Sequence, residues 1–516
     1  MWIEALILST LVASGIVLLA PNRYAGKLAA ALSLAPLALS GIMWLNYDAA
    51  GNALLGGDMA YETTTRWVEF ASYGLNWHVG VDGISMPLIV LTTILTTLAI
   101  VSAWTPIDTR QSQFYGLVLF LQAGLLGVFT ALDFFVWFIF WEVVLVPMYF
   151  LIAIWGGPRR KYAAIKFFVY TNIASLIMFV GFLTLVFSMG PSVRAIDLTQ
   201  VAQLVRTPGV VEGIAGFSPN SVKLFAFTLM FLGFAVKVPI VPFHTWLPDA
   251  HVEAPTPVSV LLAGVLLKMG TYALLRFNFT MLPGVVRDYA ALIAVFAVVS
   301  VIYGALLALA QQDLKRIVAY SSISSMGYVI LGLVAYTTHG VGGATFQMLS
   351  HGFISGLMFM VVGVIYNETH TRMVGDMSGM ADRMPWTVGI FVAAAFGYMG
   401  LPLMSGFAGE VLVFLGSFDS TISPLFTAVA MFGIVIVAGY LLWAMQRTLF
   451  GPSDLETEYE ITPAPVHDVA PLVVLLLCVI GLGVNPDIFY GMIQDAINPI
   501  IETQDALVTV LGGGLR

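Results

Sequence analysis

The sequence predicts an all-α protein that crosses a membrane many times. Of its 516 residues, 59% are hydrophobic and only 10% are charged, and the mean hydropathy is +0.93. Soluble domains carry about a quarter charged residues. Long apolar runs without the alternation of a membrane β-barrel indicate that the spans are helices. These observations exclude a soluble enzyme, a secreted disulfide scaffold and a disordered chain.

The composition also limits the chemistry of the chain. A single cysteine, Cys478, excludes a disulfide framework and any zinc or iron–sulfur site built from several thiolates. The net charge of −8 opposes nucleic-acid binding, which needs clustered cations. The sequence contains no P-loop, no GxGxxG after a strand and no HExxH motif. We therefore expect no cofactor and no metal ion in this chain.

A membrane-crossing helix needs about 20 apolar residues, and about fourteen segments meet this condition. The first begins at the N-terminus, where MWIEALILST lacks the basic segment of a signal peptide. The region 114–155 could be divided differently. The predicted spans lie near residues 2–20, 28–45, 84–104, 114–132, 134–155, 164–188, 223–246, 256–277, 289–310, 317–336, 343–366, 387–415, 424–449 and 469–491.

Lys and Arg residues in the connections predict the orientation of these spans. Loops after odd-numbered spans hold twelve of them, whereas loops on the opposite side hold seven, including Arg276. The first side is therefore predicted to be cytoplasmic, in the cell membrane of a prokaryote. Both termini and the long loops 46–83 and 189–222 would then lie on the outer face.

Five ionisable side chains lie inside the apolar runs. A charge at the bilayer centre costs several kcal/mol in most estimates, so such groups usually face a polar interior. A single one could belong to a buried ion pair that holds helices together. Five of them on separate spans favour a proton relay instead. The five residues are Glu142, Lys237, Lys268, His351 and Glu410.

Two of these spans are predicted to be broken. Pro239 and Pro242 follow Lys237, and each proline removes a helical hydrogen bond. The span of Glu410 carries Pro402 between several glycines. Interrupted helices in corresponding spans indicate inverted repeats around a midplane ion site. The span near 317–336 adds serines that could contact water or bond to their own backbone; these are Ser321, Ser322, Ser324 and Ser325.

The remaining polar segments are interpreted as solvated. Prolines 248, 255 and 257 predict an extended interfacial loop at the cytoplasmic exit of the Lys237 span, in preference to a metal site. The acidic linker 454–460 is expected to be a solvated loop, residues 495–511 a weakly amphipathic tail, and the terminal GGGLR a frayed end. The residues considered for the metal site are His244, Asp249, His251 and Glu253, and the histidines expected in solvated loops are His78, His339, His370 and His467.

Several motifs resemble one known family. The run KVPIVPFHTWLPDAHVEAPTPVSVLLAGVLLKMGTYALLR, residues 237–276, and DLKRIVAYSSIS, residues 313–324, resemble the proton-translocating antiporter-like subunits of respiratory complex I. Relatives occur in multisubunit cation/proton antiporters and membrane-bound hydrogenases. WEVVLVPMYFLI (141–152), VDGISMPLIVLT (81–92) and Glu410 in GFAGE resemble the M-type subunit, the equivalent of mitochondrial subunit 4.

The resemblance implies a fold and a set of roles. Helices 1–3 would occupy residues 1–110, two inverted five-helix repeats would occupy 111–280 and 281–450, and the last helix and tail would lie in 451–516. Glu142 would modulate the pKa of Lys237, the central proton-binding residue, while Lys268 and His351 would relay the proton toward Glu410. Partners would be L-type and N-type antiporter-like subunits and the lipid bilayer, with redox chemistry elsewhere in the complex.

One position departs from the family pattern. Many M-type sequences have histidine where this chain has Ser325, and serine takes no proton at working pH. Water held by Ser325 would have to carry the proton past the position that the histidine occupies in those sequences.

Two other functions stay open from the sequence. The chain could be a subunit of a cation/proton antiporter that redox chemistry does not drive, although the residues around Glu142 and Glu410 favour the M type. It could also be a structural scaffold whose buried charges only join helices.

Overall fold

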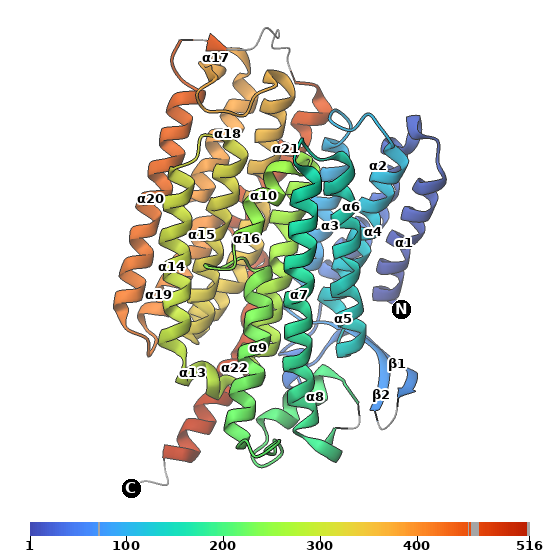
Figure 1. Ribbon diagram of the computed structural model, residues 1–516, viewed down its shortest axis with the longest axis vertical. Helices are drawn as coiled ribbons and strands as arrows, with labels where there is room; N and C mark the ends of the chain where they lie inside the picture. The colour runs from blue at the N-terminus through green and yellow to red at the C-terminus, as the bar shows by residue number, and fades with distance from the viewer. Residues whose placement is uncertain (71–72, 194, 453, 456–463, 513–516) are drawn as a thin grey trace.

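Long helices lie side by side along the vertical axis of the view in Figure 1. This computed structural model describes residues 1–70, 73–193, 195–452, 454–455 and 464–512. Within them, 13 helices are long and apolar enough to cross a membrane by length and composition. They are α1 (Trp2–Leu19), α2 (Asn22–Leu45), α3 (Ser85–Ser102), α4 (Gln111–Thr130), α5 with α6 (Phe134–Trp155), α7 (Arg160–Phe187), α9 (Pro219–Lys237), the helix Thr256–Phe279, α14 (Ala290–Leu309), α15 (Leu314–Ala335), α16 (Thr338–Thr369), α20 (Pro424–Thr448) and α21 (Val466–Val484).

The fourteenth expected span, 387–415, is a pair of shorter helices. These are α18 (Pro385–Tyr398) and α19 (Ser405–Phe418). The all-helical membrane fold and the break in this span are therefore confirmed. Gly400 and Leu403 in the connection both have positive φ, +64° and +71°, so the chain cannot continue as a right-handed helix there.

The second predicted break follows Lys237, but the chain after it is not the extended loop that we expected. Turns over 238–245 lead into α10 (Trp246–Glu253), so a second helical segment continues the seventh span. The prolines misled the prediction because they stand at helix starts. Pro248 lies in the first turn of α10, and Pro255 precedes α11 (Thr256–Leu261). A first turn tolerates proline because its N–H groups have no helical acceptor.

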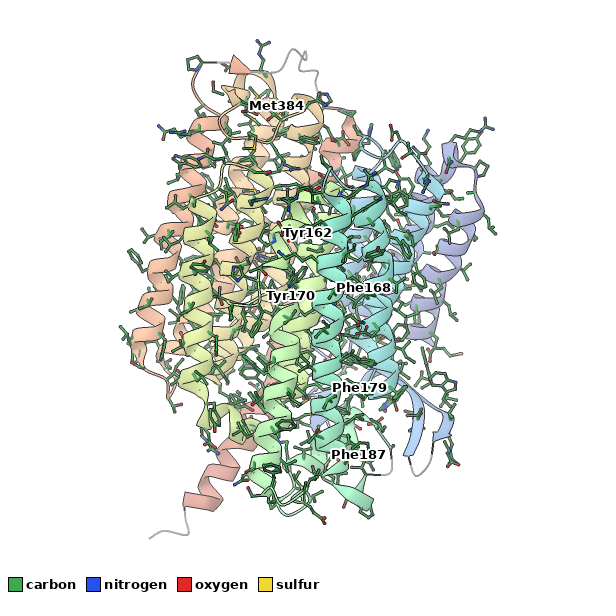
Figure 2. The ribbon with its side chains drawn as sticks, viewed as in Figure 1. Tyr162, Phe168, Tyr170, Phe179, Phe187 and Met384 are labelled. Atoms are coloured by element: carbon green, nitrogen blue, oxygen red, sulfur yellow. The ribbon has the colours of Figure 1, made fainter. Side chains whose placement is uncertain are left out.

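The outer surface of the bundle exposes many large apolar side chains, which is typical of a surface in contact with lipid. Helix α7 carries exposed aromatic side chains along its whole length, from Tyr162 through Tyr170 to Phe187 (Figure 2). Helix α7 also exposes Ile173 and Val180, and other outward-facing helices expose aliphatic side chains, among them Leu8, Val12, Val435 and Leu477.

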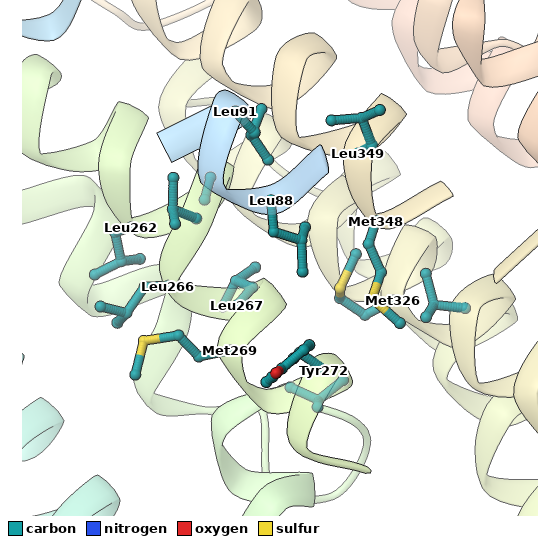
Figure 3. Packing of buried hydrophobic residues seen from close by; sticks show 14 of the residues in the cluster. Leu88, Leu91, Leu262, Leu266, Leu267, Met269, Tyr272, Met326, Met348 and Leu349 are labelled. Carbon is teal, nitrogen blue, oxygen red and sulfur yellow. The ribbon is translucent and has the colours of Figure 1, made fainter. Parts of the chain in front are cut away.

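The core is centred on α3, the helix Thr256–Phe279 and α16, all three of which are largely buried. Figure 3 shows Leu88 and Leu91 of α3 above Leu266 and Leu267, with Leu349 of α16 beside them. The helix Thr256–Phe279 is not a regular α-helix, because π-helical segments at Leu262–Leu266 and Leu274–Phe279 flank the short α12 (Leu267–Ala273).

A buried ion pair at one end of the bundle removes one residue from the count of loop Lys and Arg residues that was used to predict the topology. Arg276, expected in an outer loop, lies buried at the end of the Thr256–Phe279 helix and contacts Asp82 at 2.5 Å. Asp82 also accepts hydrogen bonds from the backbone of Ala53 and Ser85. This carboxylate therefore joins the 3-10 turn η1 (Ala53–Leu55), the start of α3 and the end of the eighth span.

Both long loops that were predicted to lie on the outer face contain regular structure that the hydropathy pattern does not reveal. Strands β1 (Ala60–Phe70) and β2 (Tyr73–Val81) form an antiparallel hairpin, with η1 before it. The second loop holds the turn η2 (Gly190–Ser192) and the helix α8 (Leu198–Arg206). A backbone bridge at Gly74–Ala195 attaches the hairpin to this second loop, and one at Val79–Ala131 attaches it to the connection between α4 and α5.

The chain after α20 differs in part from the expected loop and tail. Strand β4 (Asp454–Leu455) of the acidic linker pairs with β3 (Met377–Ser378), which follows α16 and precedes α17 (Met380–Arg383). Glu456, Glu458 and Glu460 lie outside the described residues, as does the expected frayed end after Gly512. Helix α22 (Asp487–Gly512) covers the expected tail and packs against α16 and η1.

His78 was expected to be solvated, and this prediction is wrong. The side chain lies on β2, 5% exposed, with Nδ1 bonded to Asp197 and Nε2 3.0 Å from Glu62. Burial disfavours the imidazolium, but the hydrogen bonds and charges of the two carboxylates outweigh it and raise the pKa of His78. The His78 contact in turn holds the pKa of Asp197 below its ordinary value despite its burial.

We expect the hairpin to loosen as pH rises through the pKa of His78. Because the folded pKa of His78 is raised, its stabilisation is complete below the unfolded value of about 6.5 and is lost as pH rises through the folded pKa. A charge-assisted hydrogen bond contributes about 2 kcal/mol. Hydrogen exchange of the β1–β2 amides, corrected for intrinsic rates, should show this step in the wild type and not in His78→Gln. His339→Gln, at an exposed histidine, is the control. A hairpin protection that is independent of pH would contradict the assignment.

Candidate proton-translocation site

Lys237 ends α9 at the first break and is 2% exposed. Its Nζ has no hydrogen-bond partner among the described residues and lies 5.0 Å from the ring centroid of Trp141. Trp246 closes the break, since its indole N–H donates to the carbonyl of Val236 at 2.9 Å. The ammonium is thus held at the end of a helix, where an aromatic face is its main contact.

Glu142 lies next to Trp141 in α5 (Phe134–Val143), and its Oε2 accepts a hydrogen bond from Asn172 of α7 at 3.0 Å. No ion pair within 4.0 Å joins it to Lys237 in the described chain, although the two groups interact electrostatically. A local irregularity follows at Val144, before α6 (Leu145–Trp155). Pro147, which lacks an N–H, explains it. The carboxylate therefore stands near a deformable point of its helix.

Lys268 and His351 are brought together directly. Lys268 Nζ lies 2.6 Å from Nδ1 of His351 and donates to the carbonyl of Ala263 at 2.6 Å. Ala263 belongs to the π-helical segment before α12, where the altered hydrogen-bond pattern leaves this carbonyl available to a side chain. Both side chains are buried, at 0% and 1% exposure. The two side chains are therefore direct neighbours, within the distance that proton transfer between them would require.

Two glycines make this contact possible. A Cβ at Gly352 would lie 2.9 Å from the carbonyl oxygen of Gly264, and one at Gly264 would lie 3.3 Å from that of Gly352. The backbones of the eighth span and α16 therefore approach closely one turn before Lys268 and one residue after His351.

Tyr398 extends the line of hydrogen-bonded side chains that Lys268 and His351 form, and the sequence analysis missed it. Its hydroxyl lies 3.4 Å from His351 Nε2 and 3.4 Å from the Ser322 hydroxyl. When Lys268 is an ammonium it can only donate, so Nδ1 of His351 accepts and the imidazole N–H faces Tyr398. Tyr398 is the last residue of α18, so this line reaches the second break. A tyrosine directly before Met-Gly at a predicted break was the available signal.

Glu410 lies beyond that break in α19, buried at 4% exposure. Its Oε2 has no hydrogen-bond partner in the described chain, and a Cβ at Gly400 would come within 2.3 Å of it. Gly400 thus leaves the space that the carboxylate occupies. No direct hydrogen bond among the described residues joins Glu410 to Tyr398, or Lys237 to Lys268.

The serines of α15 have mixed partners. Ser321 and Ser322 bond to the carbonyl of Val318 in their own helix, the alternative left open by the sequence, whereas Ser324 bonds to Val301 of α14. Ser325 is buried, at 6% exposure.

The residues considered for a metal site have separate partners. Asp249 pairs with Lys166 at 2.7 Å, and Glu253 accepts a hydrogen bond from the backbone of Arg159. His251, which we expected in an interfacial loop, is fully buried in α10 and stacks on Phe359 with ring centroids 4.4 Å apart.

Residues 131–437 match the family described as the transmembrane part of NADH:quinone oxidoreductase and Mrp antiporters. This chain belongs to that family. Chain 4 of NAD(P)H-quinone oxidoreductase from Nostoc sp. is 40% identical over 94% of this chain and 88% of its own length. Subunit M of F(420)H(2) dehydrogenase from Methanosarcina mazei is 39% identical, over 93% and 92%. The resemblance to the M type, or chain 4, of the antiporter-like family is therefore confirmed.

Solved structures support the same family. A chain of respiratory complex I from Thermus thermophilus with bound NADH aligns with a TM-score of 0.84 and 25% identity, covering 98% of both chains. A chain of the Mrp complex from Dietzia sp. aligns with a TM-score of 0.82, 20% identity and 99% coverage of both, which shows a shared fold.

The polar side chains considered for the proton path are here called the polar row, and the antiporter-family match contains all of them. They are Glu142, Lys237, Lys268, His351, Tyr398 and Glu410. All five ionisable residues predicted inside spans fall within 131–437, as do Tyr398 and His251. The segments outside the match are the first four spans, α1 to α4, with the hairpin, and the chain from the second half of α20 onward. The polar row therefore lies in the part of the chain that defines the family.

We expect Gly352→Val to separate Lys268 from His351. The added side chain meets the Gly264 carbonyl, which cannot move independently of its helix, so the two helices shift apart. Overpacking of this kind costs about 1–3 kcal/mol. Proton pumping by the assembled complex should fall, and thermal unfolding should occur at a lower temperature. Gly439→Val, at a glycine with open space around it, is the matched control. Pumping that equals the control would show that the glycine contact does not position the pair.

Proposed function

We propose that this chain is a proton-translocating membrane-arm subunit of an NAD(P)H–quinone oxidoreductase or a closely related quinone-reducing complex. The relatives that carry the names chain 4 and subunit M support the assignment. The observation that carries it is the buried, hydrogen-bonded row of Lys268, His351 and Tyr398. Titratable groups are costly inside an apolar bundle, and where several occur together they typically mark a proton path.

In this proposal Lys237 is the central proton carrier and Glu142 controls it. A carboxylate that approaches an ammonium stabilises the charged form, and its withdrawal favours release of the proton. The structure supports such a change because Glu142 is bonded to Asn172 while Lys237 contacts Trp141, with no ion pair between them. Quinone reduction elsewhere in the complex would move Glu142 between these partners.

From Lys237 the proton would pass to Lys268, His351 and Glu410. The step from Lys268 to His351 needs no intermediary at 2.6 Å. Steps from Lys237 to Lys268 and from Tyr398 to Glu410 would use water, because direct hydrogen bonds are absent from the described residues at both places. Glu410 would deliver the proton from the second broken helix.

We further propose that residues 111–280 and 281–450 are inverted repeats. The broken helix is the fourth member of each five-helix group, α9 with α10 in the first and α18 with α19 in the second. Lys237 lies before the break of its span, and Glu410 lies after the break of the other. The excess of Lys and Arg after odd-numbered spans would place both termini on the outer face of a prokaryotic cell membrane.

Redox chemistry would be supplied by other subunits. Partners of this chain would include L-type and N-type antiporter-like subunits, and the chain itself would hold no redox cofactor. A cation/proton antiporter without redox drive shares the fold, and co-purification with quinone-reducing subunits would distinguish the two.

Lys237→Ala should uncouple the complex. Removing a positioned proton carrier lowers transfer through this subunit by about tenfold or more. Proton uptake by inverted membrane vesicles and the quinone reduction rate are measured together, with Lys27→Ala at an exposed lysine as control. Normal pumping at a normal electron-transfer rate would exclude Lys237 as the carrier. Loss of assembly, without a pumping defect in the complexes that form, would instead indicate a scaffold.

Ser325→His tests the water bridge proposed at Ser325, the position at which this chain differs from the M-type pattern. Ser325 is buried at 6% exposure on α15, whose Ser322 hydroxyl contacts Tyr398. A titratable imidazole there should raise the pumping rate if water transfer limits it, by up to about tenfold. An unchanged rate, measured in the same vesicles, would mean that transfer past Ser325 is already fast enough.

A further inference from the structure

A basic pocket of about 440 Å³ lies at the end of the bundle that carries α8 and the hairpin. It is bounded by the end of α8, the start of α9 and α13 (Pro283–Asp288), which precedes α14. Arg206, Lys223 and Arg287 line it, against a single acidic residue, Asp288. None of these residues belongs to the polar row between the two helix breaks.

Two of the three cations of this pocket are held by backbone atoms and not by acids. Arg206 Nη1 donates to the Thr280 carbonyl at 2.7 Å, and Lys223 Nζ to that of Val205 at 3.3 Å. Nη2 of Arg206 is buried without a hydrogen-bond partner in the described chain. No ion pair within 4.0 Å involves Arg206, Lys223 or Arg287 among the described residues. A partly buried guanidinium with an unused donor is costly unless an anion binds it.

The pocket stands where the apolar outer surface ends. Phe225 on α9 is 53% exposed and Leu292 on α14 is 54% exposed, each within a turn of a pocket residue. Tyr289, which lines the pocket, precedes α14 and has the amphipathic ring typical of the membrane interface. Acyl chains could lie on the helices while a headgroup enters the pocket.

We propose that this pocket binds a phosphate group, carried by an anionic phospholipid whose acyl chains lie along α9 and α14. Arg206 and Arg287 would pair with the phosphate oxygens, because the planar guanidinium offers donors in the geometry that phosphate accepts. Asn220 and Ser221 at the rim offer neutral donors and acceptors to the polar remainder of the headgroup. Free inorganic phosphate has the same binding chemistry and is the second source to be tested.

The test uses the full chain, purified in detergent and stripped of lipid. Native mass spectrometry and thermal unfolding follow the binding of dioleoylphosphatidylglycerol, dioleoylphosphatidylcholine and inorganic phosphate. The variant Arg206→Gln/Arg287→Gln should bind phosphatidylglycerol about fivefold more weakly for each cation removed. Arg206→Lys/Arg287→Lys keeps the charges and should retain most of the binding. Arg66→Gln, at an exposed arginine of the hairpin paired with Glu69, is the matched control.

Each outcome either supports or overturns the proposed binding site. Preference for phosphatidylglycerol over phosphatidylcholine that the Gln variant loses supports the lipid site. Inorganic phosphate that stabilises the wild type, competes with the lipid and fails on the Gln variant supports the phosphate site with free phosphate as its source. Equal phosphatidylglycerol binding by the wild type, the Gln variant and Arg66→Gln overturns the proposal. Since binding is measured without pumping, the result is independent of the proposed proton path.

Discussion

The hydrogen bond between Lys268 and His351 is the interaction on which the polar interior depends. It joins the eighth span to α16 at 2.6 Å in a region where both side chains are buried. An ammonium can be kept there only if its donors are used, and the π-helical carbonyl of Ala263 and the imidazole use two of them. Gly264 and Gly352 make the approach sterically possible. The π-helical backbone, the two glycines and the placement of the charged group therefore act together to hold this contact.

The two helix breaks follow from the same constraint. An apolar bilayer offers no partner to a backbone group released from a helix, so each break must be satisfied by protein or line a polar path. At the first break the Trp246 indole bonds to the carbonyl of Val236. At the second, Ser405 begins α19 and bonds through its hydroxyl to Ser350 of α16 at 2.9 Å, next to His351. Each break is therefore fastened to the helices that carry the polar row.

Hydropathy and charge predicted much of this arrangement because both are local properties of the sequence. The spans and both breaks could be anticipated, and the family resemblance placed Lys268 and His351 in one path. Tyr398 was overlooked, since a tyrosine in an apolar run is usually core, although its position directly before a predicted break was a signal. His78 and Arg276 were misread because their burial depends on Asp197 and Asp82, which lie 119 and 194 residues away in the chain. Helix α10 was missed because a proline at a helix start looks locally like one in a loop.

The discontinuity of the polar row is itself consistent with controlled transport. A chain of hydrogen bonds that ran unbroken from Lys237 to Glu410 would let protons equilibrate between the ends whatever the state of Glu142. The described contacts are direct only in the middle, from Lys268 to Tyr398, while the two ends lie at helix breaks. Breaks are where a small backbone movement changes side-chain position most, since fewer helical hydrogen bonds oppose it. A rigid central segment between two adjustable ends is an arrangement in which conformational change, and not diffusion along a permanent wire, decides when a proton moves.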